Sequence, residues 1–148
     1  LGELLAGSDI VSLHLPHTPD TDRLIGQAEL SVMRPGSFLV NTSRGALVDE
    51  SALVDALARG RLAGAALDVL AQEPPDPNHP LLHLDNVLIT PHIGSATAET
   101  RRSMAELAVK NVLQVLAGQA PATPVGPAPP TSTGAPDSTP TSTQRGPR

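Results

Sequence analysis

The chain has 148 residues, enough for about one domain, and 15 acidic against 10 basic side chains give it a formal net charge of −5. This charge disfavours a nucleic-acid partner, and the single aromatic residue, Phe38, leaves no set of rings on which single-stranded bases could stack. The absence of cysteine excludes disulfides and is compatible with a cytoplasmic location, and no apolar run approaches the roughly 20 residues of a membrane span.

Strand-like and helix-like segments alternate between residues 1 and 118. The chain begins at Leu1 in a run typical of the middle of a helix, so we interpret it as an internal segment of a longer protein. Apolar runs predict four strands, at residues 9–15, 37–42, 62–69 and 86–90. Helical spacing predicts three further helices, at residues 27–33, 50–59 and 98–116. Asp49 and Gly60 suit the two ends of the middle one, and Ser95 or Thr97 is expected to cap the last.

Composition changes sharply near Gly118. From Gln119 to Arg148 the only large apolar residue is Val125, and eight of the 16 prolines lie there. Such a segment cannot bury enough apolar surface to offset the entropy lost on ordering. We therefore predict a disordered Pro/Ser/Thr-rich tail over residues 119–148, and favour a solvated linker over a Pro-rich ligand for a partner domain.

Polar residues follow each predicted strand. Strands that alternate with helices are joined by crossover connections and form a parallel sheet, so their carboxyl ends share one edge. Ligands of such sheets bind beyond that edge. We therefore expect these residues to converge: His14–His17, Thr42–Arg44, Asp68, Glu73 and Thr90–His92.

Arg44, Glu73 and His92 within this set would suit the reduction of a 2-keto acid. The planar guanidinium of an arginine can bind a carboxylate and polarise a carbonyl. A histidine can supply the proton that a developing alkoxide needs, because its reference pKa of about 6.5 is close to neutral pH. A neighbouring carboxylate favours the imidazolium form. Taken singly, each of the three residues is more often a solvated or structural side chain.

Several motifs resemble, in order and spacing, the second signature of the D-isomer-specific 2-hydroxyacid dehydrogenases. They are Val40–Glu50, Leu53, Ala56–Leu57, Gly60–Gly64, Ala66–Val69, Glu73–Pro74 and Asn86–Gly94. The resemblance covers essentially residues 1–118. It implies the C-terminal half of a doubly wound, Rossmann-type α/β sheet, as part of an NAD(P)-binding domain. The joint occurrence of the three polar residues in family order now favours their catalytic interpretation.

The resemblance also implies roles for individual residues. Arg44 would bind the substrate carboxylate, His92 would act as acid and base, and Glu73 would orient His92. The Asp68 side chain and the Thr42 carbonyl would contact the nicotinamide. The complete set of expected cofactor contacts is His14, Leu15, Pro16, Thr42, Ser43, Arg44, Asp68, His92 and Gly94. The cofactor would be NAD or NADP, and we expect no metal ion.

The implied substrate is a small 2-keto acid or its D-2-hydroxy acid. Residues 76–82 and 91–97 look most like glyoxylate/hydroxypyruvate reductases, although relatives that act on phosphoglycerate, lactate or phosphonate share most of the site. Glutamine takes position 73 in related formate dehydrogenases, so Glu73 favours hydroxyacid chemistry. No Gly-x-Gly-x-x-Gly occurs here, and in the family this phosphate-binding loop lies upstream. The complete enzyme is expected to be a homodimer, and this chain alone to bind the cofactor poorly.

Two alternatives from other classes stay open: a dehydrogenase-like corepressor with the same fold, and an inactive truncated fragment. A partner-peptide cleft in the absent N-terminal region would indicate the first, and an upstream in-frame phosphate loop would argue against the second.

The pairs His14 with His17 and His79 with His83 could suggest a metal site. No acidic or thiol ligands accompany them, and Pro80 disfavours a helix across the second pair, so we expect loop histidines.

Overall fold

The computed structural model describes residues 1–126, and the chain divides into two compact units after Arg101. The helices and strands are α1 (Gly2–Gly7), β1 (Ile10–Leu13), α2 (Gln27–Val32), β2 (Phe38–Asn41), η1 (Gly45–Leu47), α3 (Glu50–Ala58), β3 (Gly64–Leu67), η2 (Pro80–His83), β4 (Val87–Ile89) and α4 (Ala98–Leu116), where η marks a 3-10 helix. Every predicted strand and helix is present, and the strands are shorter than the apolar runs suggested.

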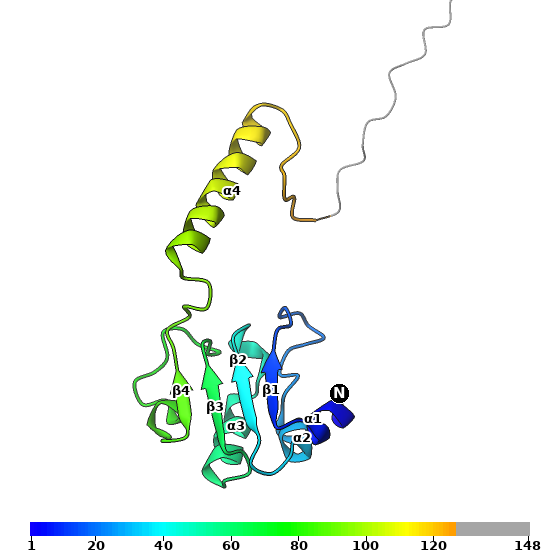
Figure 1. Ribbon diagram of the computed structural model, residues 1–148, viewed down its shortest axis with the longest axis vertical. Helices are drawn as coiled ribbons and strands as arrows, with labels where there is room; N and C mark the ends of the chain where they lie inside the picture. Colours follow the sequence, from blue (N-terminus) through cyan, green and yellow to red (C-terminus); the bar gives the residue numbers. More distant parts are fainter. Residues whose placement is uncertain (127–148) are drawn as a thin grey trace, which may run out of the picture. The chain divides into compact units, whose positions relative to one another are not determined.

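The four strands form one parallel sheet in the order β1-β2-β3-β4 (Figure 1). Ile10 lies opposite Phe38, Phe38 opposite Gly64, and Ala65 opposite Val87. The predicted α/β fold with a parallel sheet is thus confirmed. Because all strands run in one direction, their carboxyl ends lie along a single edge, where this architecture binds its ligands.

One face of this sheet packs against α1, α2 and α3 and forms an aliphatic core. Val11 and Leu13 of β1 are buried, whereas Ile10, which alternates with them along the strand, is 64% exposed. The helices contribute Leu5, Leu30, Leu53 and Leu57 to the same cluster, each almost fully buried. Burying one such leucine contributes about 2 kcal/mol of transfer free energy. The core therefore fixes the strands from which the polar loops emerge.

Helix α3 begins and ends as the sequence predicts. The Asp49 carboxylate accepts a hydrogen bond from the Ala52 amide at 3.1 Å, which satisfies one of the free N–H groups of the first turn. Beyond the C-terminus, Gly60 adopts φ +69°, a left-handed conformation that glycine accepts without strain. This helix places its first residue, Glu50, beside the loop that follows β3.

The segment around Pro80 forms a short 3-10 helix that the sequence analysis did not predict. This helix, η2 (residues 80–83), begins at Pro80 and leaves His79 outside it, so no helix spans the pair His79 and His83. Proline occupies the first turn, where its missing N–H has no intrahelical partner to lose and its fixed φ suits the turn. His79 precedes it as the cap, since its Nδ1 accepts a hydrogen bond from the Leu81 amide at 3.3 Å.

Helix α4 is capped by Thr97, whose hydroxyl accepts a hydrogen bond from the Thr100 amide at 3.1 Å. The apolar residues of α4 have helical spacing, yet none of its residues is buried. Within the predicted tail, the described residues include Ala122, whose amide donates to the Gln114 side chain at 2.9 Å. The rest of that tail, residues 127–148, lies outside the described residues. Within residues 1–126, no helix combines the length and the apolar character needed to cross a bilayer.

Candidate active site

The turn after β2 is shaped by Asn41, a buried residue at the end of the strand. Its side-chain Nδ2 donates to the Arg44 carbonyl at 2.9 Å, and its Oδ1 accepts from the Ser43 amide at 3.1 Å. Asn41 is only 1% exposed, so these bonds satisfy polar atoms that water cannot reach. They fold the backbone back on itself and leave the Arg44 side chain exposed at the edge of the sheet.

A close backbone contact joins this turn to the loop after β3. A Cβ atom placed on Gly45 would lie 1.9 Å from the Leu70 carbonyl carbon, a distance that no side chain permits. Only glycine therefore allows the two segments to touch. The Arg44 guanidinium donates from Nη1 to the Ser43 carbonyl at 2.6 Å, and an arginine has four further N–H donors for a ligand.

Asp68, the first residue after β3, binds the backbone of the loop after β4. Its Oδ1 accepts hydrogen bonds from the Thr90 hydroxyl at 2.5 Å and the Ile93 amide at 2.9 Å, and its Oδ2 accepts from the Gly94 amide at 2.8 Å. Asp68 is 7% exposed. The Thr90 hydroxyl is the largest of the causes that hold the pKa of Asp68 below its ordinary value, and burial opposes it. This carboxylate is therefore ionised, and it organises the loop.

His92 has an unusual backbone conformation that this loop imposes. Its φ of +53° lies in the left-handed region, which costs a residue other than glycine about 1–3 kcal/mol. The His92 amide donates to the Asp68 carbonyl at 2.9 Å, and the two amides that follow it in the turn are held by the Asp68 carboxylate. The contacts of Asp68 thus offset the strain and fix the backbone position from which the His92 side chain extends.

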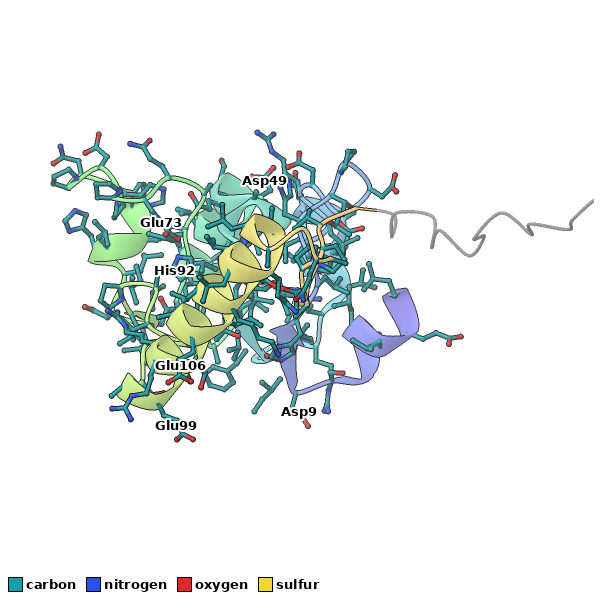
Figure 2. The ribbon with its side chains drawn as sticks, turned by 90° about the horizontal axis from the view of Figure 1, so that it is seen from above. Asp9, Asp49, Glu73, His92, Glu99 and Glu106 are labelled. Atoms are coloured by element: carbon teal, nitrogen blue, oxygen red, sulfur yellow. The ribbon has the colours of Figure 1, made fainter. Side chains whose placement is uncertain are left out.

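Glu73 and His92 form an ion pair at the carboxyl edge (Figure 2). Glu73 Oε2 lies 2.7 Å from His92 Nδ1, and Glu73 Oε1 accepts from the Leu70 amide at 3.0 Å. The hydrogen bond from His92 is the largest of the causes that lower the pKa of Glu73. An ionised carboxylate only accepts, so Nδ1 carries the proton it receives. No hydrogen bond within residues 1–126 engages Nε2.

Arg44, Glu73 and His92 line one pocket of about 260 Å³, so the structure brings the three predicted catalytic residues together. An adjoining pocket of about 310 Å³ shares Glu73 and His92 and adds Asp68. The convergence predicted from the parallel sheet is thus observed for Arg44, Asp68, Glu73 and His92. The first pocket is also lined by His17, which we expected to be only a loop histidine, and whose Nε2 lies 2.8 Å from Asp22 Oδ1.

The remaining expected cofactor contacts at the ends of β1 and β2 line neither pocket. The Ser43 hydroxyl donates to the Leu15 carbonyl and so ties the two strand ends together. His14 Nε2 lies 2.8 Å from the Ser12 hydroxyl, and the Pro16 carbonyl accepts from the Thr21 hydroxyl at 2.8 Å. Thr42 is exposed on the same edge.

One contributor to this geometry, Asn41, was not singled out from the sequence, where its signal was a polar residue at the end of an apolar strand. His17 was expected to converge with the other residues at the strand ends, but as a loop histidine and not as a site residue. Within the described residues, no group of three or more His, Asp or Glu side chains could hold a metal ion. His79 instead pairs with Glu50, and His83 with the Pro77 carbonyl.

Comparison with known proteins places this geometry in a family. Residues 1–94 match the D-isomer specific 2-hydroxyacid dehydrogenase, NAD binding domain. A glyoxylate reductase of Thermofilum pendens is 54% identical over 82% of this chain and 36% of its own length. The crystal structure of the TT0316 protein from Thermus thermophilus superposes with a TM-score of 0.81 at 56% identity, covering 84% of this chain and 40% of that one.

A third similar protein is the NADPH-dependent glyoxylate/hydroxypyruvate reductase from Sinorhizobium meliloti, whose crystal structure is in complex with NADP and malonate. It is 37% identical with a TM-score of 0.79, covering 84% of this chain and 39% of its own. The chain thus spans little more than a third of the relatives it matches. By sequence and by fold, the chain belongs to the D-isomer specific 2-hydroxyacid dehydrogenase family, in its NAD-binding domain.

Proposed function

We propose that the complete enzyme containing this chain transfers a hydride reversibly between NAD(P)H and a 2-keto acid, giving a D-2-hydroxy acid. The observation that carries this proposal is the 2.7 Å contact between His92 Nδ1 and Glu73 Oε2 in a pocket that Arg44 also lines. An acid, its supporting carboxylate and a cation for the substrate lie around one space of small-molecule size.

In this proposal Arg44 binds the substrate. The guanidinium presents a planar set of donors that matches the carboxylate of a 2-keto acid, and it polarises the adjacent carbonyl. Its present bond to the Ser43 carbonyl uses Nη1 alone. Because the side chain is exposed and lies beside the pocket, it can turn toward a substrate without breaking any contact of the core.

His92 moves the proton. With Nδ1 held by Glu73, the ring donates from Nε2 to the carbonyl oxygen in the reduction, and removes the same proton in the oxidation. Glu73 fixes the orientation of the ring and favours its charged form, because the ionised carboxylate attracts an imidazolium. The proton and the hydride together convert the keto group to a secondary alcohol.

The residues at the carboxyl edge fit the carboxamide of a nicotinamide ring. Asp68 Oδ2 accepts only the Gly94 amide, so it keeps room for a further donor, and within residues 1–126 no hydrogen bond reaches the Thr42 carbonyl. Both acceptors could hold the N–H groups of the carboxamide, with His14–Pro16 beside the ribose. When bound, NAD(P)H supplies the hydride. The pyrophosphate loop is not among these residues, and neither NAD nor NADP is favoured by them.

Among possible substrates we propose glyoxylate and hydroxypyruvate, because similar proteins carry those activities in their names. The test is a steady-state assay of the complete enzyme with glyoxylate, hydroxypyruvate, pyruvate and phosphohydroxypyruvate, each with NADH and with NADPH. We expect the highest kcat/KM for the first two substrates. A lack of nicotinamide oxidation with all four would contradict the proposed reaction, and a preference for phosphohydroxypyruvate would contradict the proposed substrate class.

The proposal extends to the setting of the enzyme. A cytoplasmic location is compatible with the absence of cysteine, and the complete enzyme is expected to form a homodimer. Light scattering of the complete enzyme would test the second expectation, with a monomeric mass as the contradicting result.

A further inference from the structure

The first residue of α3, Glu50, makes two contacts with a loop that follows β3. Its Oε1 accepts a hydrogen bond from the Ala71 amide at 2.7 Å, and its Oε2 lies 3.2 Å from His79 Nε2. The two side chains of this pair are partly shielded from water, with 17% of Glu50 and 24% of His79 exposed. Charged hydrogen bonds with little access to water are held more firmly than exposed ion pairs. One carboxylate therefore ties both ends of the loop 71–79 to α3.

The hydrogen bonds of His79 determine which nitrogen carries the proton in the neutral ring. Nδ1 accepts a hydrogen bond from the Leu81 amide at 3.3 Å, so it has no proton to give. The proton then lies on Nε2, which donates it to Glu50. His79 thus caps η2 and binds Glu50 with different nitrogens. Leu81 is 1% exposed, so this end of the loop is anchored in the core.

The tied loop carries Glu73 and touches the arginine turn. Glu73 lies two residues after Ala71, and its Oε1 accepts from the Leu70 amide at 3.0 Å. The Ala71 amide nitrogen would lie 2.3 Å from a Cβ on Gly45, so this backbone rests directly against the residue after Arg44. The position of Ala71 therefore affects both Glu73 and Arg44, which line the same pocket.

We propose that Glu50 is a positioning residue of this site: by tying both ends of the loop 71–79 to α3, it holds Glu73 against His92. Within the described residues, no hydrogen bond or ion pair joins Glu50 to the pocket side chains themselves. Its effect on catalysis rests on the proposed function, whereas its effect on the contact between Glu73 and His92 can be measured without turnover.

Two substitutions each break the contact between Glu50 and His79, one from either side, and leave an acceptor for the Ala71 amide. Glu50→Gln keeps the shape and an acceptor for the Ala71 amide, but its NH₂ group would face the Nε2–H of His79, so two donors would meet. His79→Asn leaves α3 unchanged, and asparagine remains a good cap for η2, but it is too short to reach Glu50. Asp55→Asn is the matched control, because it removes one negative charge from a 67%-exposed position of the same helix.

The first measurement is a ¹³C NMR titration of the Glu73 carboxyl in the 148-residue chain. In the wild type and in Asp55→Asn we expect the pKa of Glu73 to lie below its ordinary value. In Glu50→Gln and His79→Asn it should rise towards that value, because the contact with His92 is loosened. Wild-type titration in both variants would overturn the proposal. If circular dichroism shows that Glu50→Gln does not fold, His79→Asn decides alone.

The second measurement is the steady-state rate of the complete enzyme. Both variants should lower kcat about tenfold with little change in KM, because a displaced proton donor slows the chemical step more than substrate binding. Unchanged kcat in both would refute the positioning role in catalysis. Absence of turnover in the wild type would instead contradict the proposed function, and the Glu73 titration would still decide whether Glu50 holds the loop.

Discussion

The turn at Asp68 and the loop that carries Glu73 both follow β3, and each presents one carboxylate to the residues around His92. Asp68 is 7% exposed and receives three hydrogen bonds from Thr90, Ile93 and Gly94. The Glu73 side chain is 38% exposed and binds the imidazole itself. The first carboxylate holds the path of the backbone, and the second holds one nitrogen of the imidazole ring.

This difference shows how one short stretch can serve both folding and chemistry. Both carboxyl groups have pKa values below their ordinary range, yet the largest cause is a Thr90 hydroxyl for Asp68 and the His92 ring for Glu73. A lowered pKa alone therefore does not identify a catalytic group. The partner that lowers it is the informative feature, and substitutions should separate the two roles.

The largest effect is expected from His92→Ala. This substitution removes the ring that Glu73 contacts, in the turn that Asp68 holds. In the complete enzyme kcat should fall about 10³-fold, the usual range for loss of a general acid. Steady-state rates across pH 5–9 would measure it, with the range chosen about the reference pKa of histidine. His83→Ala, at an exposed histidine bonded to the Pro77 carbonyl, is the control and should keep wild-type kcat. Retention of wild-type kcat by His92→Ala at every pH would refute the proton-transfer role.

Arg44→Lys should show that Arg44, which lines the same pocket as Glu73, acts independently of the two carboxylates. Lysine keeps the charge but not the planar pair of donors, so kcat/KM should fall about 10²-fold. The pKa of Glu73, followed by NMR, should not change. Unchanged kcat/KM would refute the role of Arg44 in binding the substrate carboxylate. A shifted Glu73 titration would show that Arg44 and Glu73 are coupled.

Asp68→Asn tests the structural half of the comparison. The amide group of asparagine can accept at one atom only, so at least one of the three donors would face another donor. We expect the free energy of unfolding of the chain to fall by about 2 kcal/mol, the cost of leaving a buried polar group unpaired. Urea unfolding would measure this. Glu73→Gln, at a half-exposed position, should change stability much less; an equal loss in both variants would remove the distinction between the carboxylates.

Most of the scaffold could be predicted from the sequence. Apolar runs identified the four strands, and their alternation with helices predicted the parallel sheet, which in turn predicted that Arg44, Glu73 and His92 converge. These features depend on periodicity and on chain direction, which are properties of the sequence itself. The cap at Asp49 and the end at Gly60 were predictable for the same reason, since each depends on local hydrogen bonds or local φ.

The contacts that hold the site could not be predicted in this way. The donors to Asp68 include two backbone amides in a turn where His92 adopts a positive φ. The link from Glu50 to Ala71 spans 21 residues and depends on how the loop folds. In α4 the apolar spacing correctly predicted a helix, but spacing does not say what covers its apolar residues. Long-range polar contacts and burial therefore required the structure.

Glu73→Gln should lower kcat of the complete enzyme about tenfold, a smaller effect than loss of His92, because the ring remains present. Glutamine can still accept from His92 Nδ1, but it cannot form the ion pair that the carboxylate makes with the ring. The loss should therefore appear in kcat, with little change in KM. Asp55→Asn, which removes one negative charge from α3, is the control. Unchanged kcat in Glu73→Gln would refute the role of Glu73 in supporting the acid.

The smallest expected effect is a difference between the two carboxylates in how the free energy of unfolding depends on pH. Each carboxyl group has a folded-state pKa below its unfolded value. The stability that it contributes is therefore present above the unfolded pKa, which is about 4.3 for a glutamate and about 3.9 for an aspartate. This stability is lost as the pH falls through the folded pKa. Urea unfolding of the chain at steps from about pH 6 to pH 3 should therefore show a shallower acid decline in Asp68→Asn than in the wild type. Glu73→Gln should flatten it less, because water screens a side chain that is 38% exposed. Equal flattening in the two variants would mean that Glu73 stabilises the loop as much as Asp68 does, and that the fold depends on the contact between Glu73 and His92 as well as on Asp68.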